Sequence, residues 1–345
     1  SADDGDFLPN ELAPGSGGSV FTIAGLPIDN TTAFHVIDGY DNADMNTFSG
    51  GSKLNDDPNT WTWKTGKPPA KDDMNHILFF FSSDVMGNIW FVGAGDRKKV
   101  QGNTYMDFEL LQNPLYMEND QSFSSMGPDG GRTIGDLAIT VEYTIGGTNP
   151  GLYIYRWEDT GQGEFGYVPV TPANGTTFLA VNSDSSIVVP YGAYGSSSYE
   201  AGAFTELAVN INEVVPGMYA CLDIKAVIAK TKASQSITAM LKDIIEPVAV
   251  DISSAPVVSL EDTTICFGET ATLTPIIHSG TGPYTYEWST GETTESIMVT
   301  PDTTTAYWVI VTGVNGCPSD TAYATVTVLP LPDCFIYGPD AICPL

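Results

Sequence analysis

The run from Leu260 to Leu329 constrains the fold more than any other part of the chain. It contains Cys266, a tryptophan near its middle (Trp288) and Cys317. Thr-rich segments of alternating apolar and polar residues lie between these markers, and clusters of Gly, Pro and Asn separate the segments. This order of cysteine, tryptophan and cysteine is typical of a small immunoglobulin-type sandwich. The sequence therefore predicts an Ig-like β-sandwich domain over residues 257–329.

Cys266 and Cys317 flank the tryptophan in the way an intersheet disulfide does, and we expect them to be bonded; two buried free thiols are the alternative. Such a crosslink would stabilise the domain by about 4 kcal/mol in the chain-entropy model and would indicate an oxidising, extracellular compartment. Cys221 has no obvious mate and is expected to be a buried free thiol. Cys334 and Cys343 either form a local bridge or await a partner for Cys343 in a further repeat.

Residues 20–250 contain many short segments rich in β-branched and aromatic residues, separated by Gly, Asn, Asp and Pro, without alternating helices. This pattern predicts an all-β fold, a large jelly-roll-like β-sandwich. One stretch is ambiguous: alternation favours a strand through Lys230, and residues 236–245 are left open as a possible short helix.

The remaining segments are expected to be connectors and ends. Residues 1–19 are acidic and then Gly/Ser/Pro-rich, which predicts a flexible or docked N-terminal arm. Residues 247–256 are expected to form the linker between the two domains. Residues 333–345 echo the start of the Ig-like domain, so we expect them to begin a further repeat of a longer array.

The charge balance excludes several partners. The chain has 42 acidic and 13 basic residues, a net charge of −29, so nucleic acid and anionic membrane surfaces are poor partners. No run of 18 apolar residues exists, which argues against membrane insertion. The chain begins at Ser1 without an initiator Met, as expected of a mature N-terminus after signal removal, although an arbitrary fragment boundary is the alternative.

Calcium is the expected cofactor, because short carboxylates on Gly-rich loops suit an ion that takes six to eight oxygen ligands. Seven aspartates crowd into one part of the first domain and are the candidate ligands: Asp38, Asp41, Asp44, Asp56, Asp57, Asp72 and Asp73. Their spacing differs from that of an EF-hand loop. The alternative is that Asp favours turns and keeps the surface soluble.

Two acids could in principle support glycoside hydrolysis. Asp107 and Glu109 alternate along one predicted strand and should share a face, as a catalytic carboxylate pair would. Arg97 and Arg132 could instead pair with them, and we favour this buried ion-pair interpretation. No triad context surrounds the three histidines, and no catalytic residue is predicted.

A carbohydrate-binding module is the alternative function. Trp61 and Trp63 lie near the acidic loops, and aromatic faces beside Asp and Asn hold sugars in many β-sandwich lectins, whereas core packing of these tryptophans is the competing interpretation. The Tyr/Gly/Ser-rich stretch 190–199 (PYGAYGSSSY) is either a second contact surface or an ordinary loop.

Several phrases in the first domain carry a family resemblance. They are Lys71-Asp72-Asp73, Gly95-Asp96-Arg97, residues 102–112, residues 127–136 and residues 230–234. Together they resemble the N-terminal domain of large Bacteroidota surface proteins exported by type IX secretion, and residues 257–329 resemble the Ig-like/PKD-like repeats of such adhesins.

This resemblance implies a non-enzymatic adhesin or extracellular fibre subunit at the cell surface. The expected partners are copies of the same chain or neighbouring repeats, and surface glycans are the partners in the carbohydrate-binding alternative. The resemblance transfers no catalytic residues.

Overall fold

The computed structural model describes residues 20–331 except 23, 41–45, 85, 145–149, 183–187, 215–220 and 222. The expectations for Asp41, Asp44, Cys334 and Cys343, and for the two chain ends, therefore lie outside the described residues. The chain divides into two compact units, Ser1–Ser254 and Ala255–Leu345. The described parts of both are built almost entirely from strands, with one α-helix, α1 (Ile211–Val214), and one 3₁₀ turn, η2 (Pro58–Thr60). The predicted all-β class is confirmed.

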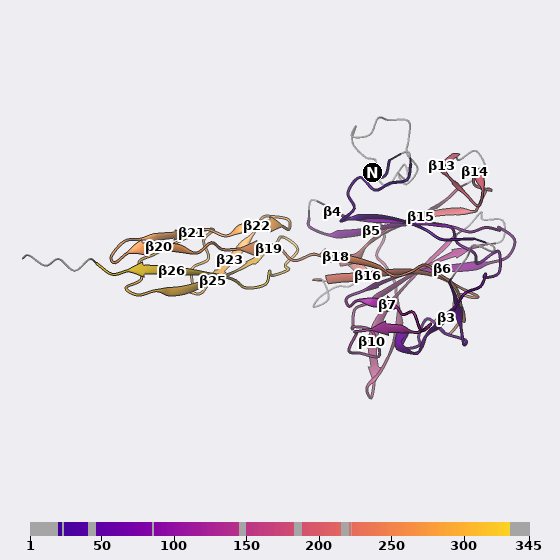
Figure 1. The fold of residues 1–345 in the computed structure, drawn as a ribbon, viewed down its shortest axis with the longest axis horizontal. Coiled ribbons are helices and arrows are strands. Elements are labelled where there is room, and N and C mark those ends of the chain that lie inside the picture. The colour runs from indigo at the N-terminus through magenta and orange to yellow at the C-terminus, as the bar shows by residue number, and fades with distance from the viewer. Residues whose placement is uncertain are drawn as a thin grey trace, which may run out of the picture. The chain divides into compact units, whose positions relative to one another are not determined.

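The first unit contains two large sheets, seen as stacked layers in Figure 1. The smaller sheet has the order β1-β4-β5-β15-β12, and its strands are antiparallel. Its strands are β1 (Ala33–Ile37), β4 (His76–Ser83), β5 (Ile89–Asp96), β15 (Phe204–Asn210) and β12 (Thr177–Val181).

The larger sheet has nine strands in the order β11-β10-β9-β6-β16-β17-β2-β3, with β18 also paired to β16. Its strands are β11 (Glu164–Val170), β10 (Gly151–Gly161), β9 (Leu137–Tyr143), β6 (Thr104–Leu111), β16 (Asp223–Lys232), β17 (Leu241–Ile244), β2 (Thr47–Ser49), β3 (Thr62–Lys64) and β18 (Val248–Ser253). Residues 241–244, where a short helix was considered, are therefore a strand. Most of the expected linker is also a strand, β18, because its alternating Val250 and Ile252 are buried against the core.

The main core lies between the two sheets because strand alternation places apolar residues on their facing sides. Ile77, Phe79 and Phe81 of β4 point into this core, together with Met106 and Phe108 of β6. The intervening residues of the same strands point to the outer faces. The outer face of each sheet therefore also carries apolar residues, which other segments must bury.

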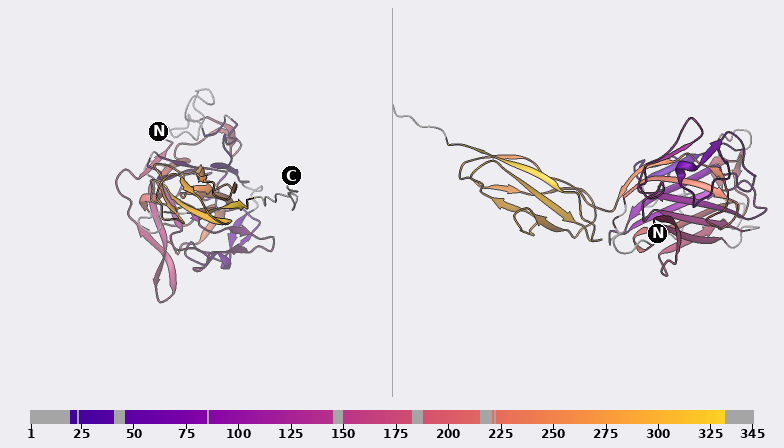
Figure 2. Two further views of the ribbon diagram at one scale, coloured as in Figure 1. Left: turned by 90° about the vertical axis from the view of Figure 1, so that its left-hand side faces the viewer. Right: turned by 90° about the horizontal axis from the view of Figure 1, so that it is seen from below.

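The outer faces are covered by shorter segments. Val20, Phe21 and the hairpin of β13 (Val188–Ala193) and β14 (Ser196–Ser198) pack on the smaller sheet, in a cluster with Leu78 and Tyr199. On the larger sheet, η2 and the hairpin of β7 (Leu115–Met117) and β8 (Phe123–Ser125) accompany a cluster that includes Trp61. Figures 1 and 2 show that the β13–β14 hairpin lies beyond the smaller sheet, on the side away from β6.

The second unit is the predicted Ig-like sandwich. Its largest sheet has the order β20-β26-β25-β23, and two strand pairs, β21-β24 and β19-β22, complete it. The strands are β19 (Val257–Ser259), β20 (Thr263–Cys266), β21 (Ala271–Leu273), β22 (Ile276–Ser279), β23 (Thr285–Trp288), β24 (Ile297–Val299), β25 (Thr305–Thr312) and β26 (Ala322–Leu329). Trp288 is 1% exposed in the centre of the core, and its Nε1 donates to the Thr294 carbonyl over 2.8 Å.

The predicted Cys266–Cys317 disulfide is wrong. Cys266 is a free and exposed thiol, whereas Cys317 is fully buried and disulfide-bonded. Cys221, expected to be a free thiol, is also disulfide-bonded. The reason lies in the pleat of β20, where Ile265 points into the core and the next residue, Cys266, must point outward.

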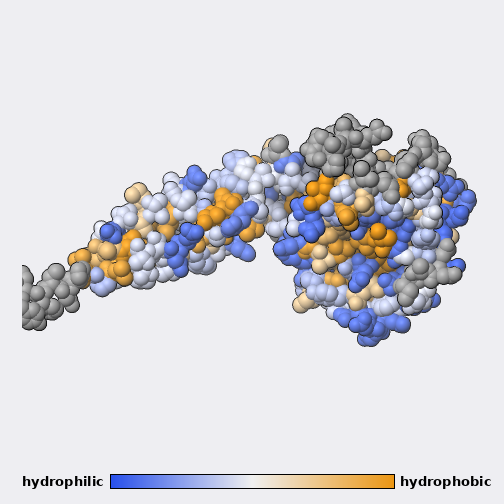
Figure 3. Space-filling model, turned by 45° about the horizontal axis from the view of Figure 1, so that its top comes forward, coloured by the Kyte–Doolittle hydropathy of each residue, from blue (hydrophilic) through white to orange (hydrophobic). Residues whose placement is uncertain are grey.

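Exposed hydrophobic side chains interrupt the hydrophilic surface of both units (Figure 3). Met298 of β24 and Tyr323 of β26 are among the most exposed on the Ig-like unit. Isolated apolar residues of this kind are normal on protein surfaces and mark no interface by themselves. No helix in the described part of the chain is long and apolar enough to cross a bilayer.

Candidate functional site: a neutral pocket beside a histidine pair

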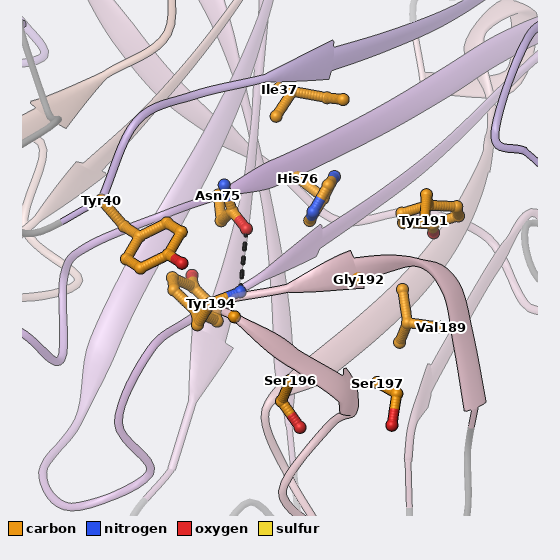
Figure 4. Close-up of a pocket in the computed structure, with 11 residues that line it drawn as sticks. Ile37, Tyr40, Asn75, His76, Val189, Tyr191, Gly192, Tyr194, Ser196 and Ser197 are labelled. Carbon is orange, nitrogen blue, oxygen red and sulfur yellow. Dashed lines mark hydrogen bonds between the residues drawn. The ribbon is translucent and has the colours of Figure 1, made fainter.

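A pocket of about 570 Å³ opens between the end of β1, the start of β4 and the β13–β14 hairpin (Figure 4). Antiparallel pairing of β1 with β4 places Ile37 opposite His76, which brings the two strand ends to the pocket. The hairpin forms the other wall, because Ala193 pairs with Ser196 around a two-residue turn. The pocket is lined by Ile37, Tyr40, Asn75, His76, Val189, Tyr191, Gly192, Tyr194, Gly195, Ser196 and Ser197.

The hairpin turn places Tyr194 in an uncommon conformation. Both turn residues have positive φ angles, 51° for Tyr194 and 76° for Gly195, as tight hairpin turns require. Glycine adopts this conformation freely, whereas a tyrosine is strained in it. The backbone N–H of Tyr194 donates to Asn75 Oδ1 over 3.0 Å, the contact drawn in Figure 4. The Tyr194 hydroxyl lies 2.8 Å from both the Asp73 carbonyl and Asp96 Oδ1. These contacts hold the turn against the smaller sheet.

A pair of histidines borders the pocket, because His76 lines it and contacts His35. His35 Nε2 is 2.8 Å from His76 Nδ1, and His35 Nδ1 is 2.7 Å from the Gly25 carbonyl. Since a carbonyl only accepts, His35 Nδ1 carries a hydrogen, and in a neutral pair His76 Nδ1 donates to His35 Nε2. Burial lowers the pKa of both imidazoles, that of His76 to about 4, although a backbone hydrogen bond with Gly192 favours its protonated form. The pair is therefore neutral at physiological pH.

A buried carboxylate, Asp96 of β5, organises the same region. It accepts hydrogen bonds from the backbone N–H groups of Asn75 and His76, over 2.8 and 3.0 Å, and from the hydroxyl of Tyr199 over 2.9 Å. Burial raises the pKa of Asp96 to about 6, against the opposing effect of these donors. Asp96 thus links the start of β4 to the hairpin without itself lining the pocket.

The acid pair predicted from the sequence is found on the other sheet, on one face of β6 as expected. Both Asp107 and Glu109 are fully buried. Glu109 accepts from Arg132 Nε over 2.5 Å, from the hydroxyl of Tyr167 over 2.5 Å and from Lys230 Nζ. Burial alone would raise the pKa of Glu109, but Arg132 and Lys230 outweigh it and hold this pKa at about 2. Glu109 is therefore a permanent anion and a poor general acid.

The favoured ion-pair interpretation holds for Arg132. Its Nη1 and Nη2 donate to the carbonyls of Asp56 and Leu54, each over 2.8 Å. The guanidinium carbon lies 4.6 Å from the ring centre of Trp157 and 5.2 Å from that of Trp61. Each of the three nitrogens of this buried cation therefore donates to an oxygen, and two aromatic rings lie close to the guanidinium group.

The partner of Asp107 was not foreseen. It is Lys232 of β16, whose Nζ lies 2.6 Å from Asp107 Oδ1 and 3.1 Å from Thr140 Oγ1. Arg97, the other candidate, is also buried, but it donates to backbone carbonyls, including those of Gly102 and Thr144, each over 2.9 Å.

The described aspartates of the predicted calcium site are separately engaged. Asp38 Oδ1 accepts the backbone N–H of Gly39 over 2.9 Å. Asp72 pairs with Lys71 over 2.7 Å, and Asp73 lies 3.8 Å from Lys98 Nζ. Asp56 and Asp57 accept backbone N–H groups within turns, over 2.9 Å each. Within residues 20–331, leaving aside the gaps given above, no group of three or more His, Cys, Asp or Glu could hold a metal ion.

The tryptophans proposed for sugar binding do not form an open site. Trp61 is fully buried, and its Nε1 donates to the Lys53 carbonyl over 2.9 Å. Its neighbour in the sequence, Trp63, is half-buried and donates to the Glu118 carbonyl over 3.1 Å. The core-packing interpretation of Trp61 is therefore correct, and the aromatic residues that line a pocket are tyrosines.

The chain matches no protein-family model and no curated protein. Among solved structures it is similar to "Clostridium thermocellum CbhA fibronectin(III)-like modules", with a TM-score of 0.21 and 13% identity, over 54% of this chain and 90% of that one. It is also similar to "DIP-gamma IG1+IG2" (TM-score 0.19, 10% identity, 69% and 89% covered) and to "Dscam1 isoform 7.44, N-terminal four Ig domains" (0.20, 8%, 77% and 84%). TM-scores this low assign the chain to no family.

Proposed function

We propose that this chain is part of a secreted, non-enzymatic cell-surface protein with a structural or adhesive role. The observation that carries most weight is the locked state of Asp107 and Glu109. The two acids best placed for hydrolysis are fully buried and paired with Lys232, Arg132 and Lys230. Buried ion pairs of this kind specify a fold and leave no carboxylate for a substrate.

The extracellular part of the proposal is supported by the disulfide-bonded Cys221 and Cys317, since structural disulfides persist in oxidising compartments. An Ig-like sandwich suits a spacer that holds other domains away from a surface. The resemblance of several phrases in the first domain to Bacteroidota surface proteins of the type IX pathway is consistent with the same role.

Association with further copies is part of this proposal. The strands β1 and β12 form the two ends of the five-stranded sheet, and an end strand can accept an added strand from another chain. We propose that the N-terminal arm, residues 1–19, supplies such a strand. Deleting these residues should abolish assemblies seen by electron microscopy, and unchanged assemblies would refute the arm's role.

Two measurements test the main proposal. The purified chain should hydrolyse none of a panel of chromogenic glycosides, and an antibody raised against it should label unpermeabilised cells of the organism that makes it. Turnover of any of these glycosides, or labelling only after permeabilisation, would overturn it.

A further inference from the structure

We propose that the pocket between β1, β4 and the β13–β14 hairpin binds an uncharged carbohydrate, without calcium. This inference rests on the proposed adhesive function and names the class of ligand that it would recognise. The site differs from the tryptophan site expected from the sequence, because its aromatic groups are tyrosines of the hairpin and of the segment after β1.

The described lining of the pocket carries no formal charge. None of its eleven residues is Asp, Glu, Lys or Arg, although the chain contains 42 acidic and 13 basic residues. The neighbouring Lys98 is engaged, since its Nζ lies 5.2 Å from the ring centre of Tyr40 and 3.8 Å from Asp73. An anionic sugar would meet no free cation in the pocket and would be repelled by the net charge of −29. A neutral ligand meets neither obstacle.

The polar and apolar groups of the pocket suit a sugar ring. Ser196 and Ser197 are exposed on one side and offer hydroxyl groups that both donate and accept. On the other side, Ile37 is 62% exposed and Tyr40 is half-buried. Pyranoses present hydroxyls at their edges and C–H groups on their faces, so they can use both kinds of wall. The volume of about 570 Å³ lies within the range of small-molecule sites, roughly 300–1,000 Å³.

The hairpin wall is held in a strained shape, which is a second observation in favour of a binding site. A tyrosine at φ 51° persists only where its surroundings fix it, and such residues gather at ligand sites. Tyr194 is fixed by Asn75 through its backbone N–H and by Asp96 through its hydroxyl. Both partners are almost fully buried. The wall is therefore formed before a ligand arrives, which lowers the entropic cost of binding.

The proposal gives calcium no part in holding the ligand. No carboxylate of the described residues lines the pocket, and Asp96 behind it already accepts hydrogen bonds from two backbone N–H groups and two tyrosine hydroxyls. Binding should therefore survive a chelator, unlike that of lectins that hold the sugar through a bound Ca²⁺.

Saturation-transfer NMR on the full chain tests the proposal. The neutral probes are the methyl glycosides of glucose, galactose, mannose and N-acetylglucosamine, and the anionic probes are those of sialic acid and glucuronic acid. We expect transfer to at least one neutral probe, unchanged by EDTA, and none to the anionic probes. No transfer to any neutral probe, equal transfer to the anionic ones, or loss with EDTA would overturn the proposal.

Variants then locate the site. Ser197→Trp fills the pocket from an exposed position and should abolish the transfer, and Tyr40→Ala should weaken binding by about tenfold. The matched controls are Ser83→Trp, exposed at the other end of β4, and Tyr116→Ala on β7, and both should bind as the parent does. Binding retained by a folded Ser197→Trp protein would place the ligand elsewhere and refute the assignment.

Failure here can be separated from failure of the proposed function. Suppose that no neutral sugar binds, while the antibody labels unpermeabilised cells and no glycoside is hydrolysed. Only the assignment of the ligand is then wrong. If sugars bind but are also hydrolysed, the non-enzymatic function falls instead.

Discussion

Arg132 donates its Nε hydrogen to Glu109 Oε1 over 2.5 Å, and neither side chain is exposed to solvent. The two residues come from different parts of the first unit, β6 and the turn before β9. Lys230 of β16 reaches the second oxygen of the same carboxylate. One anion therefore joins two strands and a turn, and two cations depend on it for their charge balance.

Glu109→Gln should destabilise the first unit by about 3–5 kcal/mol, because it leaves Arg132 and Lys230 as uncompensated buried cations. Urea unfolding followed by tryptophan fluorescence measures the loss. The matched control is Glu158→Gln, whose pair with Arg156 is partly exposed and should contribute less than about 1 kcal/mol. Equal effects of the two substitutions would contradict the buried-network interpretation.

Two groups beside the pocket should give opposite pH dependences. The folded-state pKa of His76 is lowered from 6.5 to about 4, so its stabilising contribution is full above 6.5 and is lost as the pH falls toward 4. The folded-state pKa of Asp96 is raised from 3.8 to about 6, so its ionisation destabilises the fold as the pH rises from 3.8 through 6. Over this window the two contributions oppose each other.

Substituting either residue should therefore leave the pH dependence of the other unopposed and measurable. On acidification from pH 6.5 to 4, His76→Asn should gain stability relative to the parent and Asp96→Asn should lose it, each by about 3 kcal/mol at most. Denaturant unfolding at several pH values gives these slopes, and the effects of titrating groups that interact with neither His76 nor Asp96 cancel in the differences from the parent. Slopes of the same sign for both variants would contradict the assignment.

Cys266 should be the reactive thiol among the described cysteines, because it is exposed and free while Cys317 is buried and disulfide-bonded. Iodoacetamide without a reductant should label Cys266 in the native protein, as peptide mapping would show, and should leave Cys317 unlabelled. Cys266→Ser should change the melting temperature little. Protection of Cys266 until a reductant is added would restore the disulfide predicted from the sequence.

Calcium binding stays a prediction for the segment from Asp38 to Asp44. If it occurs there, added Ca²⁺ should raise the melting temperature of the parent, and the Asp41→Asn/Asp44→Asn variant should lose this effect. Asp56→Asn/Asp57→Asn is the control and should keep it, because these two side chains accept turn N–H groups. Equal melting temperatures in Ca²⁺ and in EDTA would remove calcium from the proposal.

The sequence alone predicts which side chains share a face of a single strand, because side chains alternate along it. Asp107 and Glu109 were correctly placed on one face of β6, with Arg132 as a partner. The lysines were missed, although the apolar alternation through Ala226 and Ile228 continues to Lys230 and Lys232 on the same face of β16. The prediction for Cys266 failed because it placed this residue on the inward face of β20, which its neighbour Ile265 occupies.

The pocket could not be predicted in this way because it depends on strand pairing. His35 and His76 meet only because β1 and β4 pair with Ile37 opposite His76, which makes the histidines diagonal neighbours on one face. Nothing in the sequence around either histidine indicates which residues of β1 and β4 lie opposite each other. The Tyr/Gly/Ser stretch 190–199 did mark one wall, but its partner wall comes from strands more than a hundred residues earlier in the chain.

The parallel pairing of β20 with β26 has a mechanical consequence for the Ig-like unit. Four residue pairs, from Thr263↔Val326 to Cys266↔Leu329, join a strand near the start of this unit to the last strand that the structure describes in it. Tension applied through the two ends of the unit would pull these strands past each other along their length. Their slanted hydrogen bonds would then share the load and break together rather than one after another, so this pairing acts as a clamp against stretching.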